Sequence, residues 1–276
     1  DALPISVITI TKDIAIGGGF TTTNWLQPDP NVNSTIIDGE NQRRVVYISS
    51  ESKVIISGVH IQQGLVTDTN GAGIYNPQGN LTLENSWVYS NTTVKVDPIA
   101  EPKGGGIASG FANADAELML LDSAFYGNQS YIGAAVSVIT GTAIIERNTI
   151  FDNSADFGSI ALDGGHTEIR NNQIHGNHAA QHAGAIAVTT DAILELKNGT
   201  IYSNTTGGNG GGIWIANGDV AITNTLIISN TASAGGAIYG LPTSVAYTDF
   251  YGNDPAYTPS GTNRTENPDF VDPANG

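Results

Sequence analysis

The sequence predicts an all-β fold, a single right-handed parallel β-helix (solenoid) of roughly ten rungs of about 25 residues. One observation is a motif of an aliphatic or aromatic residue, two variable residues and an asparagine. Its seven asparagines step by 37, 25, 24, 27, 26 and 23 residues: Asn91, Asn128, Asn153, Asn177, Asn204, Asn230 and Asn253. A second motif, glycine-rich and ending in Ile or Val as in Gly71–Ile74, interleaves with the first. Two motifs that keep phase over seven copies define stacked, equivalent units.

The apolar residues within each unit fall at spacings of two, as a strand requires. The positions eight and three before the repeat Asn hold Leu83 and Val88 in the first copy, and Leu120 and Phe125 in the second. The position five before it is small or polar in every copy. Such short strands cannot bury a face alone, but they can when rungs stack about 4.8 Å apart. We therefore expect the eight-before and three-before columns to form the core, and the polar columns to hydrogen-bond along the stack.

Composition excludes several classes of protein. The chain of 276 residues has 26 Asp and Glu against 10 Lys and Arg, a net charge of −16, which disfavours nucleic-acid binding. It has no cysteine, so disulfides, thiolate metal sites and cysteine nucleophiles are excluded. No apolar run reaches the roughly 18 residues of a membrane-spanning helix, and we expect no membrane insertion of this segment.

The chain is expected to form one β-helix domain, 1–276. Residues 1–34 are an N-terminal cap and loop, residues 35–255 the repeat rungs, and residues 256–276 a polar tail or a truncated closing segment. The chain does not open on a charged-then-apolar signal peptide. We expect it to be a piece of a longer secreted protein.

The repeat resembles that of a known family. The pairing of Gly-Gly-Ala-Ile (Gly235–Ile238) with Phe-x-x-Asn (Phe125–Asn128 and Phe250–Asn253) is similar to the repeat of polymorphic outer-membrane proteins and of other bacterial right-handed parallel β-helix surface proteins. The resemblance covers roughly residues 35–255. It implies a β-helix at a cell surface, while the membrane barrel of those proteins is not matched in this chain.

The outward face of the repeat carries the main candidate site. Because the three-before residue points inward, the two-before residue points outward, and this position is largely aromatic. An exposed apolar stripe about 30 Å long marks an interaction site, although stacked rings also stabilise neighbouring rungs. The candidate ligand-binding residues are Trp87, Tyr89, Tyr126, Phe151, His175, Tyr202 and Tyr251. Tyr75, Trp214 and Tyr239, outward after the glycine motif, form a second such strip.

Metal binding has weaker support. His175, His178 and His182 have a spacing that resembles a metal motif, but on strand and turn they do not share a helix face. Asp38–Asn41 and Asp68–Gly71 are oxygen-rich without a calcium-loop spacing. We expect no cofactor, with weak surface Ca²⁺ binding as the alternative.

An inserted loop interrupts the repeat between Asn91 and Ile107, which are 16 residues apart where other copies need 7 to 9. It contains Lys95, Glu101 and Lys103. Insertions on one face of a solenoid often build its binding site, although most are neutral.

The sequence favours a non-enzymatic, extracellular structural or adhesive surface module over an enzyme. Its partner would be a glycan or a surface protein held by the outward aromatic column, and self-assembly into a larger surface structure is a further expectation. The alternative is a polysaccharide lyase or glycoside hydrolase of the β-helix type. The sequence strings of pectate-lyase-like and polygalacturonase-like sites are absent, but β-helix catalytic residues come from different rungs, so the alternative stays open.

Overall fold

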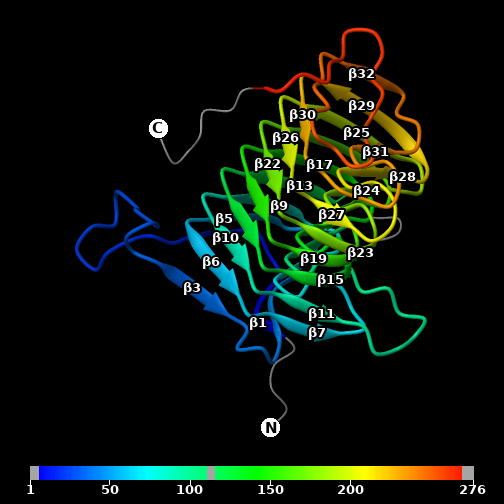
Figure 1. Cartoon of the computed structure of the whole chain (residues 1–276). Coiled ribbons are helices and arrows are strands. Elements are labelled where there is room, and N and C mark those ends of the chain that lie inside the picture. Colours follow the sequence, from blue (N-terminus) through cyan, green and yellow to red (C-terminus); the bar gives the residue numbers. More distant parts are fainter. Residues whose placement is uncertain (1–5, 111–115, 269–276) are drawn as a thin grey trace.

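The computed structural model describes residues 6–110 and 116–268 (Figure 1). All regular structure in this part of the chain is β-strand, and none of it is a helix long and apolar enough to cross a membrane. Strands about one repeat apart pair in parallel and build four sheets, A to D, which the chain visits in that order in the six turns from β4 to β27; the first and last turns of the described chain lack a strand of sheet D. This is the architecture of a parallel β-helix, and the predicted fold class is confirmed.

Sheets A and B contain nine strands each. Sheet A consists of β1 (Ser6–Ile10), β4 (Arg44–Ile48), β8 (Ile74–Asn76), β12 (Ile107–Ser109), β16 (Val136–Val138), β20 (Ile160–Leu162), β24 (Ile186–Val188), β28 (Ile213–Ile215) and β31 (Ile238–Tyr239). Sheet B consists of β2 (Ile14–Gly17), β5 (Lys53–Ser57), β9 (Asn80–Glu84), β13 (Glu117–Leu121), β17 (Thr142–Glu146), β21 (His166–Arg170), β25 (Ala192–Lys197), β29 (Gly218–Thr223) and β32 (Ser244–Ala246).

Sheets C and D contain eight and six strands. Sheet C consists of β3 (Thr35–Asp38), β6 (Val59–Gln62), β10 (Trp87–Tyr89), β14 (Ala124–Tyr126), β18 (Thr149–Phe151), β22 (Gln173–His175), β26 (Thr200–Tyr202) and β30 (Leu226–Ile228). Sheet D consists of β7 (Leu65–Thr67), β11 (Thr92–Val94), β15 (Gln129–Ile132), β19 (Ser154–Phe157), β23 (His178–His182) and β27 (Thr205–Thr206).

The helix has about eight turns, and the prediction of roughly ten was wrong. The turns run from β1–β3 to β28–β30, and β31 and β32 open another. Three segments of the described chain do not wind around the core and add no turns. These are the loop at 18–34, which projects in blue in Figure 1, the inserted loop at 95–103, and the segment after residue 254.

The core columns are those that the repeat predicts. Leu83 pairs with Leu120 and Leu120 with Ile145, while Val88 pairs with Phe125, so equivalent residues lie directly over one another. The eight-before and three-before side chains are buried throughout, except that Val245 at the last turn is partly buried. Tyr257, from the segment after the last turn, stacks on Phe250 with ring centroids 4.2 Å apart and covers that end of the core.

The repeat asparagines form a buried ladder. Each side-chain Nδ2 donates to Oδ1 of the next asparagine at 2.9–3.0 Å, and the backbone N–H donates to the same oxygen at 3.0–3.1 Å. Because each amide also donates to a backbone carbonyl of the neighbouring turn, as Asn153 does to Phe125, the buried polar groups are paired. A shorter ladder runs through the five-before column, where Asn148 Nδ2 donates to Asn172 Oδ1 at 3.1 Å.

The glycine motif starts with a residue of positive φ before each sheet A strand. Gly133 has φ of 63°, and a Cβ there would lie 2.6 Å from the Val136 carbonyl oxygen and 3.0 Å from Ser137 Cβ. The requirement is for the left-handed conformation, which glycine adopts without strain. Ala183 takes the equivalent place with φ of 60°.

Candidate functional site

Five aromatic rings form a continuous stack on the outer face of sheet C. We call them the aromatic column: Tyr89, Tyr126, Phe151, His175 and Tyr202. Successive ring centroids are 4.8, 5.0, 5.3 and 4.6 Å apart, and interplanar angles are 2°, 17°, 11° and 19°. One ring per turn at the same register position produces this stack, because neighbouring strands are separated by about the thickness of a ring contact.

The other predicted members of this site lie outside the stack. Trp87 lies two residues before Tyr89 in β10 and stacks on His60 at 4.5 Å. Tyr251 is separated from Tyr202 by Ile228, which is only 5% exposed. The predicted stripe is therefore a block of five rings that is flanked by Gln62, which bonds the Tyr89 hydroxyl, at one end and by Ile228 at the other.

Stacking determines which part of each ring is accessible. The faces of the inner rings lie against neighbouring rings, so their edges point away from the helix. Burial raises the pKa of Tyr126 and of Tyr202. Burial between Phe151 and Tyr202 has the opposite effect on the imidazole and lowers the pKa of His175. The charge of Asp152 opposes this lowering. Neutral, apolar rings are thus favoured along the column.

The structure separates the three histidines that resembled a metal motif. His175 belongs to the column on sheet C, the His178 ring bonds Thr205 Oγ1 at 3.0 Å on sheet D, and His182 stacks on Trp214. In the described part of the chain, no group of three or more His, Asp or Glu side chains is placed to hold a metal ion.

The oxygen-rich turns are held by protein groups. Asp68 Oδ1 accepts the backbone N–H groups of Val96 and Asp97, which fixes the base of the inserted loop. Asp38 accepts the N–H of Glu40 and the amide of Gln62. Weak calcium binding at these turns stays a prediction.

A groove runs over sheet A beside the inserted loop. Its volume is about 450 Å³. The floor is the outward position of β20 and β24, occupied by Ala161 and Ala187, which are 1% and 2% exposed. Tyr131 and Phe157 of sheet D form one wall, and Asp163, after β20, lies on the other.

Trp214 occupies the same outward position in β28 and closes one end of the groove. Its indole packs on the cluster of Ala161, Ala183 and Ala187, and stacks on His182 at 4.7 Å. Small floor residues leave room for the indole to lie over the sheet.

The inserted loop contributes charge to the groove. Lys103 Nζ forms an ion pair with Asp163 Oδ2, and both side chains are largely buried, at 19% and 14% exposed. Thr189 Oγ1 donates to Asp163 Oδ1 at 2.8 Å, so both carboxylate oxygens are engaged. Lys95 Nζ lies 3.8 Å from the centroid of the Tyr131 ring, in a neighbouring hollow over sheet D and outside the groove.

Sequence reasoning found parts of this groove but did not assemble them. It singled out Lys103 and Trp214 in two separate contexts. It missed Tyr131 and Phe157, whose only signal is that they follow a repeat Asn by three or four residues.

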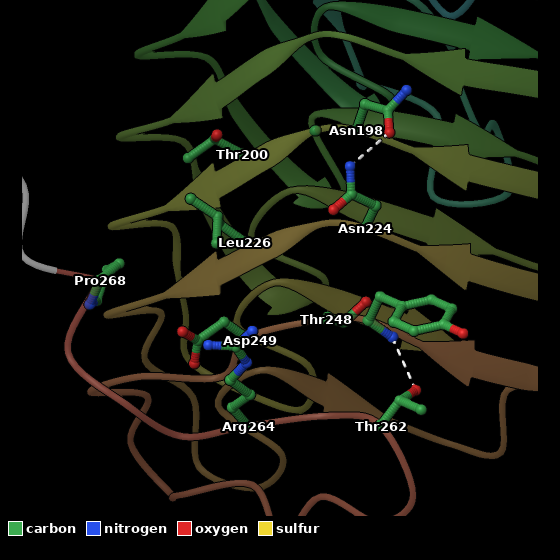
Figure 2. Close-up of a pocket in the computed structure, with 11 residues that line it drawn as sticks. Asn198, Thr200, Asn224, Leu226, Thr248, Asp249, Thr262, Arg264 and Pro268 are labelled. Atoms are coloured by element: carbon green, nitrogen blue, oxygen red, sulfur yellow. Dashed lines mark hydrogen bonds between the residues drawn. The ribbon is translucent and has the colours of Figure 1, made fainter.

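Another hollow lies at the last turns of the helix (Figure 2), with a volume of about 720 Å³. The segment that carries Thr262 and Arg264 crosses it. Asn224 donates to Asn198 Oδ1 at 2.8 Å, and Thr262 Oγ1 accepts the N–H of Tyr247 at 3.1 Å. Because these polar groups pair with one another, the hollow resembles the seam between the helix and its closing segment.

Sheet B carries a network of ion pairs on its outer face and in the adjoining turns. A chain of ion pairs links Arg147 to Asp122 at 2.7 Å and Arg170 to Glu146 at 2.9 Å, and continues to Lys197 with Glu168 and Glu195. Hydrogen bonds from Arg147 and Arg170 lower the pKa of Asp122 and of Glu146, respectively. This surface differs clearly from the column and the groove.

Comparison with known proteins agrees with this architecture. A family model described as "Right handed beta helix region" matches residues 105–254, which are 150 of the 276 residues. The chain belongs to this right-handed β-helix family. No curated protein and no solved structure matches it. The narrower resemblance to polymorphic outer-membrane proteins stays a prediction.

Proposed function

We propose that this chain is a non-enzymatic, extracellular adhesive module that binds a partner through the aromatic column. The right-handed β-helix fold is consistent with a surface protein. The stack of Tyr89, Tyr126, Phe151, His175 and Tyr202 carries the proposal, because a stripe of rings already held in place loses little conformational freedom on binding.

Ring geometry favours a protein partner over a glycan. A sugar ring stacks on the face of an aromatic ring, and the inner faces of the column are covered by neighbouring rings. Ring edges and the phenol hydroxyls suit the apolar and polar side chains of a protein surface. The net charge of −16 favours a basic partner.

The test is binding of the purified chain to arrays of immobilised basic extracellular proteins and of glycans. Tyr126→Ala and Tyr202→Ala should each abolish binding to the protein array while circular dichroism stays unchanged. Tyr247→Ala, which removes a 67% exposed ring outside the column, is the matched control and should bind normally. Binding that survives both column substitutions contradicts the proposal, and binding only to glycans contradicts the partner class.

The groove keeps the enzyme alternative, a polysaccharide lyase or hydrolase, open to test. It brings Glu101, Lys103 and Asp163 together, but both oxygens of Asp163 are engaged, which disfavours it as a base. Turnover of acidic or neutral polysaccharides that is lost in Asp163→Asn would overturn the adhesive proposal.

A further inference from the structure

The groove over sheet A is independent of the aromatic column and has its own chemistry. Three aromatic side chains reach it from separate elements and meet at large angles. The Tyr131 and Phe157 centroids are 5.4 Å apart at 77°, and those of Phe157 and Trp214 are 6.2 Å apart at 38°. Rings at such angles line a concave site, in contrast to the nearly parallel rings of the column.

One ammonium group already lines this groove, where Lys103 Nζ pairs with Asp163. Lys95 Nζ lies 3.8 Å from the Tyr131 centroid, outside the lining of the groove. Both lysines come from the inserted loop, and both are held by a ring or a carboxylate of the main helix. Since Lys103 neutralises Asp163, the groove offers an organic cation its aromatic rings and the carboxylate of Glu101.

The polar groups of the groove disfavour a sugar. Asp163 uses both oxygens on Lys103 and Thr189, which leaves Glu101, Thr190 and Tyr131 among the charged and hydroxyl side chains that line the groove. A sugar ring brings several hydroxyls that each need a partner when buried. A quaternary ammonium group makes no conventional hydrogen bond, so the lack of free partners costs it little.

We propose that this groove binds a quaternary ammonium group, such as the trimethylammonium head of choline. The group contacts Phe157 and Trp214, with Glu101 at the rim balancing its charge. The volume of about 450 Å³ is within the range of small-molecule sites. The net charge of −16 raises the local concentration of cations.

The test compares choline with 3,3-dimethyl-1-butanol, its neutral isostere, by calorimetric or NMR titration of the whole chain. Choline should bind about tenfold more tightly, because only the charged form gains the cation–π interaction. Phosphocholine carries the same trimethylammonium group. Tighter binding of phosphocholine than of choline identifies a phosphorylated source of this group, and tighter binding of choline identifies a free one. Equal affinity of choline and the isostere, no saturable binding, or tighter binding of glucose or galactose than of choline overturns the proposal.

Two variants locate the site. Phe157→Leu and Trp214→Leu keep apolar volume but remove ring faces, and each should weaken choline binding about tenfold. Trp87→Leu, which removes an aromatic ring on sheet C, is the control and should leave the affinity unchanged. If Trp214→Leu fails to fold, Phe157→Leu, at a partly exposed position, decides the result alone. Unchanged affinity in a folded Phe157→Leu variant contradicts this placement.

Discussion

The aromatic column and the groove are both built from aromatic side chains, yet they form in different ways. The column takes one residue from the same position of five successive turns, and its rings are nearly parallel. The groove takes Tyr131, Phe157 and Trp214 from different positions, together with Lys103 of an inserted loop. Repetition places like residues over like, whereas a concave site of varied chemistry needs departures from the repeat.

The largest expected effect contrasts two phenylalanines, one in the periodic core and one in the groove. Phe125 is fully buried in β14, and Phe125→Ala should destabilise the chain by about 4 kcal/mol through loss of burial and a cavity. Phe157→Ala, at a partly exposed groove position, should cost about 1 kcal/mol. Urea unfolding measures both. Similar costs would show that the groove residue is as structural as the core residue.

The asparagine ladder supplies the next effect. Asn153→Ala removes the acceptor for the N–H and Nδ2 of Asn128 and leaves the Phe125 carbonyl without its side-chain donor. Buried groups without partners should make this cost about 3 kcal/mol in urea unfolding. Asn217→Ala, at an exposed asparagine that bonds only the exposed Asp191, is the control and should cost less than about 0.5 kcal/mol. If the ladder does not contribute to stability, Asn153→Ala and Asn217→Ala should lower the free energy of unfolding equally.

The periodic part of the molecule, with its core and aromatic column, and the groove differ in how well the sequence could predict them. Leu83, Leu120 and Ile145 recur at one position of the repeat, and their spacing was enough to predict parallel stacking and the core. The stack of Tyr126 on Phe151 follows from the same repeat, because side chains alternate between inward and outward along a strand and this position is therefore predicted to point outward. The predicted turn number was too high, because the loops at 18–34 and 95–103 and the segment after residue 254 add no turns.

The groove could not be predicted for a physical reason. Lys103 and Asp163 are 60 residues apart, and their pairing depends on the path of the inserted loop across intervening turns. Phe157 lies where a β-bulge shifts the register between β19 and β23, so its direction does not follow from counting residues. Positions that break the repeat carry little signal in a single sequence.

The ion pair of the groove gives a smaller effect that depends on salt. Asp163→Asn removes the charge that pairs with Lys103, and should cost about 1 kcal/mol at low ionic strength. Since salt screens such a pair, the difference from the unsubstituted chain should shrink in about 1 M NaCl. Urea unfolding at the two salt concentrations measures it. A difference independent of salt would show that packing of the carboxylate, and not its charge, holds the inserted loop.

The smallest effect belongs to His175 in the column. Burial between Phe151 and Tyr202 lowers its pKa in the folded chain, so the unfolded chain binds the proton more readily. Stability should therefore be unaffected at pH 8, where the imidazole is neutral in both states. It should fall as the pH drops through the unfolded value near about 6.5, and stop falling below the folded pKa. His175→Phe keeps a ring in the stack and removes the titration, so its urea midpoint should fall less between pH 8 and 5.5. If the urea midpoints of the unsubstituted protein and of His175→Phe fall equally, the column does not desolvate His175. Its rings would then be more open to water than the stack implies.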